Sequence, residues 1–308
     1  MPLSDVWSDP NVRWVLLGCM LLGLSGGVIG SFTYIRRQSL TGDVLAHAAL
    51  PGVCLAYMAI GAKSVWAFVV GAALAGWAAV LCVGLLVRRS RLKADTALAA
   101  ALSVFFGFGV VLLTFIQRGE GGNVSGLDAF LFGQAAAMTA GDVRAMATLS
   151  AVVLAAGVLF FKEFKLTGFD PEFARSIGFS AGRIDALLMS LVVVTVVAGI
   201  QAVGVVLMSA FLIAPAVAAR CWTERFGRMV ALAGVFGAVS GWVGGYAGTF
   251  SHQLPTGALA VLAASALFVL SLLFSPRRGL LARAVRRFVQ RRMTRAEFRR
   301  AAVGVKKP

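Results

Sequence analysis

Residues 64–87 read SVWAFVVGAALAGWAAVLCVGLLV, a stretch without a charged residue that ends at Arg88 and Arg89. About 20 such residues in an α-helix cross the hydrocarbon core of a bilayer, so this stretch predicts a transmembrane helix. Hydrophobic residues make up 59% of the chain, and the mean hydropathy is +0.86. The sequence therefore predicts an all-α integral membrane protein, a polytopic bundle of about nine transmembrane helices. The other eight apolar runs are 14–35, 44–62, 96–117, 145–161, 184–200, 202–219, 229–249 and 256–275, with the sixth and seventh spans meeting near Gln201.

Basic residues are divided unevenly between the two sets of connecting loops. If the amino terminus lies outside, 25 of the 29 lysines and arginines fall on the inner side. Cytoplasmic loops carry the excess of basic residues in membrane proteins, so the count predicts an external amino terminus and a cytoplasmic carboxyl terminus. A model with eight spans would break this segregation from the point where two spans merged. The residues on the outer side are Arg13, Lys63, Arg118 and Arg144.

Two regions follow from this pattern, a transmembrane domain at 1–275 and a basic cytoplasmic tail at 276–308. In the tail, apolar residues fall near one helical face among many arginines, which is typical of an interfacial amphipathic helix. A solvated extension that only fixes the topology explains the same pattern. The net charge of +16 thus lies mainly at the inner membrane face. We expect membrane lipids, and no nucleic acid, as its partner.

The segment GDVLAHAALPG at 42–52 places Asp43 four residues before His47, one of two histidines in the chain. On a helix the two residues lie one turn apart on the same face, roughly 6 Å between Cα atoms, so both side chains can reach one cation. Ionisable side chains at membrane depth are costly and indicate a function. The alternative is that Asp43 caps the helix and His47 bonds a backbone carbonyl. Further along the same face of the predicted helix, Cys54 and Met58 are either core residues or ligands at a second metal-binding position.

A second polar segment, FDPEFARSIG at 169–178, lies between apolar spans on the predicted inner side. Asp170 can cap a short helix that has Pro171 at its first position and Glu172 in its first turn, with Gly178 as the stop. A compact helix outside the membrane is suited to docking a partner. An ordinary structured loop is the alternative.

The chain resembles the permeases of metal-transporting ABC importers. The resemblance rests on RRQSLTGDVLAHAALPG at 36–52, LDAFLFGQ at 127–134, FDPEFARSIG at 169–178, QAVGVVLMSAFLIAPAVAAR at 201–220 and LPTGA at 254–258. It implies a subunit of the bacterial cytoplasmic membrane that forms a homo- or heterodimer with a second permease subunit. It also implies two ATP-binding subunits and an extracytoplasmic metal-binding lipoprotein as partners.

The same resemblance implies roles for particular residues. Asp43 and His47 correspond to residues associated with metal in the translocation path of these permeases. The FDPEFA segment corresponds to the coupling helix that fits a groove on the ATPase; its residues here are Phe169, Asp170, Pro171, Glu172, Phe173 and Ala174. The sequence HAALPG resembles that of the manganese and iron branch of the family. Manganese and iron are therefore favoured as cargo, and zinc is the near alternative.

This chain cannot supply its own energy from ATP, because the sequence contains no GxxxxGK[ST] segment to bind the phosphates of ATP. If transport is driven by ATP, the ATPase is therefore another chain. We therefore expect a transport subunit and not an enzyme, without a permanently bound cofactor and with the divalent metal as substrate.

Three other classes of membrane protein are alternatives, and each requires a feature of its own. A proton-coupled secondary metal transporter would show matching halves, and we find no convincing internal repeat. An ABC permease for a metal chelate or vitamin needs a wide, mostly neutral cavity. An intramembrane metalloprotease needs HExxH, whereas His47 is followed by AALPG.

Overall fold

The computed structural model describes residues 10–36, 38, 40–61, 65–118, 133, 138–249, 255–275 and 279, without the side chains of Val65, Gln201 and Val206. All elements in this part of the chain are helices, which confirms the predicted all-α fold. The basic tail after 279 and most of the LDAFLFGQ segment lie outside the described residues. In chain order the helices are α2 (Pro10–Ile35), α3 (Thr41–Ile60), α4 (Val65–Arg89), α5 (Ala94–Arg118), α7 (Ala140–Leu159), α8 (Phe161–Phe169), α9 (Pro171–Ser176), α10 (Ala181–Val203), α11 (Val205–Trp222), α12 (Phe226–Thr249) and α13 (Thr256–Phe274).

Eight of these helices are long and apolar enough to cross a membrane, and α11 contributes the shorter apolar helix Leu207–Trp222. The sixth and seventh predicted spans are separate helices, as expected. The break falls at Gly204 and not at Gln201. Gly204 has a φ of +89°, a backbone conformation that glycine adopts without the steric cost of a Cβ atom.

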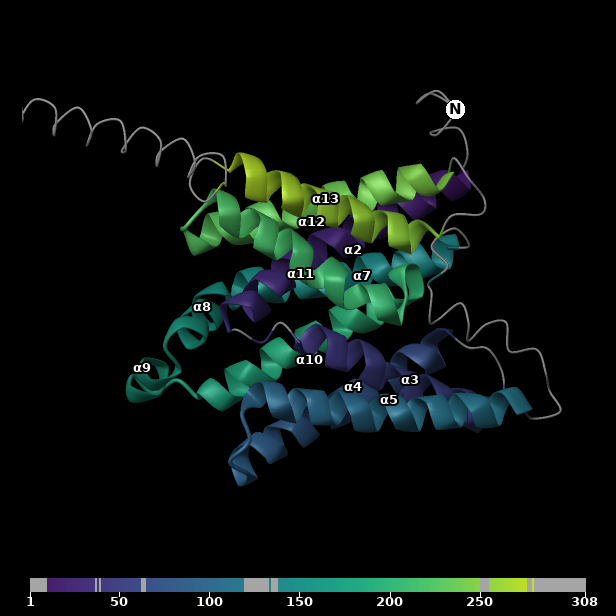
Figure 1. Ribbon diagram of the computed structural model, residues 1–308, viewed down its shortest axis with the longest axis horizontal. Helices are drawn as coiled ribbons and strands as arrows, with labels where there is room; N and C mark the ends of the chain where they lie inside the picture. Colours follow the sequence, from purple (N-terminus) through teal and green to yellow (C-terminus); the bar gives the residue numbers. More distant parts are fainter. Residues whose placement is uncertain are drawn as a thin grey trace, which may run out of the picture.

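The spanning helices form two groups that α10 and α11 join (Figure 1). One group contains α2, α7, α12 and α13, and the other contains α3, α4 and α5. α11 contacts α2, α12 and α13 on one side and α3 on the other, while α10 contacts α2, α7, α3 and α4. The helix that carries Asp43 and His47 therefore lies where the two groups meet.

Glycines let α2 and α12 approach each other closely. A Cβ atom added to Gly237 would overlap the backbone of Gly23, and one added to Gly241 would overlap the backbone of Cys19. Small residues at this spacing permit such contacts in membranes, where hydrophobicity alone does not drive helices together.

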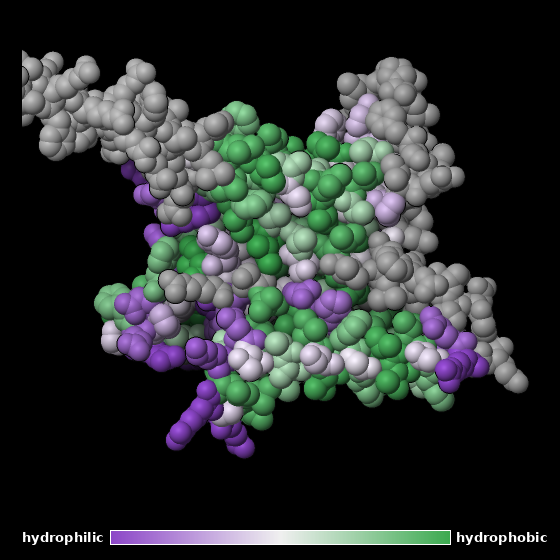
Figure 2. Space-filling view, viewed as in Figure 1, coloured by the Kyte–Doolittle hydropathy of each residue, from purple (hydrophilic) through white to green (hydrophobic). Residues whose placement is uncertain are grey.

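Polar side chains are most numerous at one end of the bundle, near α8, α9 and the link between α4 and α5 (Figure 2). Apolar side chains cover most of the middle, where one small polar group is also visible. The basic last turn of α4, the basic residues of α8 and α9, and the α11–α12 link all belong to this end. We call it the basic end. The sequence predicts that it faces the cytoplasm.

Candidate functional site

Asp43 and His47 lie on one face of α3, as the sequence predicts. Asp43 occupies the first turn of the helix, and His47 follows one turn later. The His47 Nε2 atom is 3.6 Å from the Asp43 Oδ1 atom, which is too long for a hydrogen bond. Two adjacent ligands at about 2.1 Å from one ion are about 3.0–3.4 Å apart. A small closure of the pair would therefore place both atoms on one divalent cation.

Among the described residues, the second nitrogen of His47 has no polar partner. Its Nδ1 atom is buried and accepts or donates no hydrogen bond among the described residues. The ring packs instead against Phe106 of α5, with ring centroids 4.7 Å apart and planes at 73°. The described part of α3 thus does not contain the bond to a backbone carbonyl that the alternative reading of His47 requires. The N-cap residue of α3 is Leu40, and no side chain caps the helix there, so Asp43 is not the cap.

Asp43 opens onto a groove of about 410 Å³ between α3, α11 and α13. Ser209, Ala210 and Ile213 line it from α11, and Phe268 lines it from α13. The Asp43 side chain is 34% exposed and that of His47 is 16% exposed. An ion that enters from the groove would therefore meet the carboxylate before the imidazole.

The number of ligands at the pair is small. Within the described ranges, no three His, Cys, Asp or Glu side chains come close enough together to hold a metal ion. Pro51 lies inside α3 and lacks the N–H that would bond the His47 carbonyl in a regular helix. That carbonyl oxygen is therefore a candidate third ligand for a metal ion at this pair.

Cys54 and Met58 do not join this pair. Cys54 is fully buried, packs with Leu50 and Leu113, and has its Sγ atom 4.0 Å from the Gly109 carbonyl oxygen. Met58 is 48% exposed. Neither residue lines the groove at Asp43.

The FDPEFARSIG segment forms the short capped helix that the sequence predicts. The Asp170 carboxylate accepts a hydrogen bond of 2.9 Å from the Phe173 N–H, and Pro171 is the first residue of α9. Gly178 follows the helix with a φ of +90°.

Large apolar side chains project from this element although it lies at the basic end. Phe169 is 61% exposed, Phe173 is 52% exposed and Ile177 is 50% exposed, whereas Ala174 is fully buried. Exposed apolar patches rimmed by polar residues mark sites of interaction. We call Phe169, Phe173 and Ile177 the docking face.

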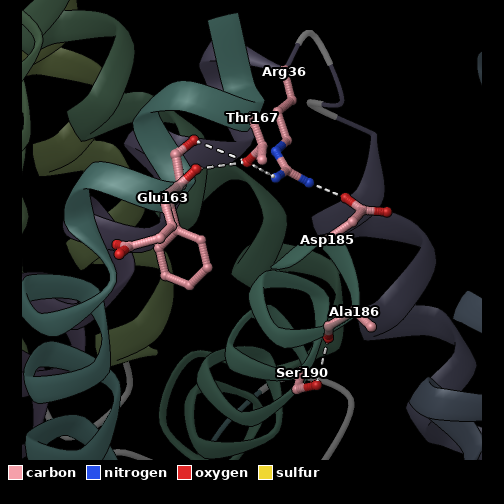
Figure 3. A network of polar contacts seen from close by, with 7 residues as sticks. Arg36, Glu163, Thr167, Asp185, Ala186 and Ser190 are labelled. Carbon is pink, nitrogen blue, oxygen red and sulfur yellow. Dashed lines mark hydrogen bonds and ion pairs between the residues drawn. The ribbon is translucent and has the colours of Figure 1, made fainter. Parts of the chain in front are cut away.

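Sequence reasoning missed the contacts that join distant segments. It singled out neither Phe106 beside His47 nor Ser209 in the groove. It also missed the network in which buried Arg36 pairs with half-exposed Asp185 and bonds buried Thr167 (Figure 3). Arg36 opens the RRQSLTGD motif, but its partners lie more than 130 positions away.

Spanning helices that enclose a carboxylate and an imidazole, with a capped helix at one end, define the class as a polytopic membrane permease. The chain belongs to the ABC 3 transport family, whose model matches residues 8–275. This range contains every described helix. The resemblance to metal-transporting ABC permeases is confirmed.

Several named proteins are similar to this chain. The manganese transport system membrane protein MntC of Bacillus subtilis is 49% identical over 288 residues, which cover 94% of this chain and 66% of MntC. The zinc transport system membrane protein TroC of Treponema pallidum is 41% identical over 285 residues, which cover 92% of this chain and 96% of TroC. In the solved structure of PsaBC from Streptococcus pneumoniae in complex with Fab, one chain is 29% identical with a TM-score of 0.79. That match covers 90% of this chain and 96% of the other.

Proposed function

We propose that this chain is the transmembrane permease subunit of an ATP-driven importer of a divalent metal, with manganese or iron favoured and zinc as the near alternative. The observation that carries the proposal is the Asp43–His47 pair in a bundle of apolar helices, with Nε2 and Oδ1 3.6 Å apart. Ionisable groups at membrane depth are expensive and mark ion pathways. The names of MntC and TroC, which specify manganese and zinc transport, support a divalent metal as cargo.

The chemistry of the pair suits transient binding. One carboxylate oxygen and one imidazole nitrogen are ligands for manganese, iron and zinc alike. Two side chains are an incomplete set, so water, the His47 carbonyl or the second permease subunit must supply the remaining ligands. A site of this kind can hold an ion without trapping it, as passage across a membrane requires.

The docking face supports a separate ATPase as the source of energy. Phe169, Phe173 and Ile177 expose half or more of their side-chain surface, and a partner subunit would bury it. The chain has no phosphate-binding GxxxxGK[ST] segment, so hydrolysis belongs to the partner. Binding and hydrolysis of ATP there shift this subunit between inward-open and outward-open packings, because a ligand moves an equilibrium only through different affinities for its states.

The basic end supports the orientation. Basic residues concentrate in cytoplasmic loops, so α8 and α9 face the cytoplasm and the groove at Asp43 receives metal from the opposite side. An extracytoplasmic binding lipoprotein delivers the ion there. The protein then resides in the bacterial cytoplasmic membrane with its amino terminus outside.

Reconstitution tests the proposal. The chain, its ATPase, its second permease subunit and the binding protein are placed in liposomes, with and without ATP and with and without an imposed proton gradient. Uptake of radiolabelled manganese, iron and zinc is then measured. We expect uptake that requires ATP and persists when a protonophore is added. Uptake that requires a proton gradient and ignores ATP would establish the secondary transporter instead.

A further inference from the structure

Arg36 connects three segments that are far apart in the sequence. It directly follows the last residue of α2. Its Nη1 atom pairs with Asp185 Oδ1 in the first turns of α10, and its Nη2 atom donates a 2.9 Å hydrogen bond to Thr167 Oγ1 in α8 (Figure 3). The Arg36 side chain is only 9% exposed, so this cation depends on the partners that the protein provides.

The α8 arm of this network leads directly to the docking helix. The Thr167 hydroxyl that accepts from Arg36 also donates to the Glu163 carbonyl oxygen at 2.9 Å. Three residues later, Asp170 caps α9. The neighbouring Phe164 packs edge-on against Phe32 of α2, with ring centroids 5.4 Å apart. α8 is therefore held to the end of α2 by both a polar and an aromatic contact.

The other arm leads to the proposed metal residues. After Arg36, the Gln38 N–H bonds the Thr33 carbonyl at 3.2 Å, and the Thr41 N–H bonds the Gln38 carbonyl at 3.1 Å. Asp43 lies in the first turn of α3, seven residues after Arg36. A displacement of Arg36 would therefore act close to Asp43 along the chain.

Charge explains why these segments must move together. Burial lowers the pKa of Arg36 to about 10, which still leaves the guanidinium charged at neutral pH. A buried charge that loses its counter-charge is strongly destabilised. Movement of α10 away from Arg36 would take away the Asp185 carboxylate, and movement of α8 would take away the Thr167 hydroxyl that accepts from the same guanidinium. A shared movement is therefore favoured over separate ones.

We propose that Arg36, with Asp185 as its counter-charge, is a positioning residue that couples the docking helix α9, through Thr167, to the Asp43–His47 pair at the start of α3. This inference rests on the proposed function. A purely structural staple would hold the fold together without affecting how much metal moves for each ATP hydrolysed. The ratio of metal imported to ATP hydrolysed therefore distinguishes coupling from stability.

The test uses the reconstituted complex with the variants Arg36→Gln and Thr167→Val. Thr167→Val removes the α8 arm and leaves the ion pair, so it reports on coupling even if Arg36→Gln assembles poorly. We expect the ratio to fall at least about fivefold in Arg36→Gln and about twofold or more in Thr167→Val, with the ATPase still bound. The double exchange Arg36→Asp with Asp185→Arg is expected to restore part of the ratio.

Arg88→Gln is the matched control. Arg88 lines the same cavity of about 1010 Å³ as Arg36 and Asp185 but takes no part in the network, so its ratio should equal that of the unaltered complex. Unchanged ratios in assembled Arg36→Gln and Thr167→Val, including a lower yield with a normal ratio, would overturn the inference. Failure of the unaltered complex to import metal with ATP would instead overturn the proposed function.

Discussion

Shortening Phe173 to alanine is expected to weaken the proposed contact between this chain and an ATPase subunit. Phe173 is 52% exposed, so about half of its side chain remains for a partner to bury. Full burial of a phenylalanine side chain contributes about 1.5–3 kcal/mol, and the exposed half therefore contributes about 0.8–1.5 kcal/mol. Because about 1.4 kcal/mol is a tenfold change in affinity, the Kd should rise about 4- to 12-fold.

The assay is a titration of the purified ATPase subunit into the detergent-solubilised, fluorescently labelled permease. Phe115→Ala provides a matched control, because Phe115 is 68% exposed but lies on the membrane-spanning helix α5. Its loss should leave the Kd unchanged. The docking face would be refuted if Phe173→Ala and Phe169→Ala both bound the ATPase as tightly as the unaltered chain.

Three further changes have defined outcomes. Glu172→Arg reverses a charge in the first turn of α9 and should lower metal-stimulated ATP hydrolysis; unchanged hydrolysis and unchanged co-purification would remove Glu172 from the contact. Asp170→Ala deletes the cap on the Phe173 N–H, which costs about 1 kcal/mol of local helix stability, and should speed amide hydrogen exchange across α9 but not across α7. Gly237→Val forces a side chain into the Gly23 backbone, and overpacking of this kind costs about 1–3 kcal/mol; a melting temperature equal to that of the unaltered protein would contradict the close α2–α12 contact.

Local patterns in the sequence predicted the spanning helices and the short capped helix α9 well. Hydrophobic run length located the spans because the thickness of the bilayer fixes the length of a helix that crosses it. The cap at Asp170 and the first-position Pro171 defined α9, because both signals act within a few residues. The break between the sixth and seventh spans was displaced to Gly204, since an apolar glycine with positive φ does not interrupt the hydropathy pattern.

Contacts between distant segments could not be predicted in the same way. The spacing of Asp43 and His47 fixed their shared face, but Phe106 reaches His47 only because α3 packs against α5. Arg36 and Asp185 are 149 positions apart, and in the sequence each resembles an ordinary charge at a helix end. Their pairing follows from the packing of α2 beside α10. The hydrophobic pattern within one segment does not show which other segment it packs against.

ATP-driven metal uptake by Asp43→Asn and His47→Ala complexes is the most direct test of the proposed metal path. Asp95→Asn is the control, because Asp95 is also a carboxylate in the first turn of a spanning helix but lies exposed on α5. We expect both site variants to lose uptake of manganese, iron and zinc while they still bind the ATPase, and Asp95→Asn to transport normally. Uptake at the unaltered rate by both site variants would contradict a path that passes the carboxylate and the imidazole of α3.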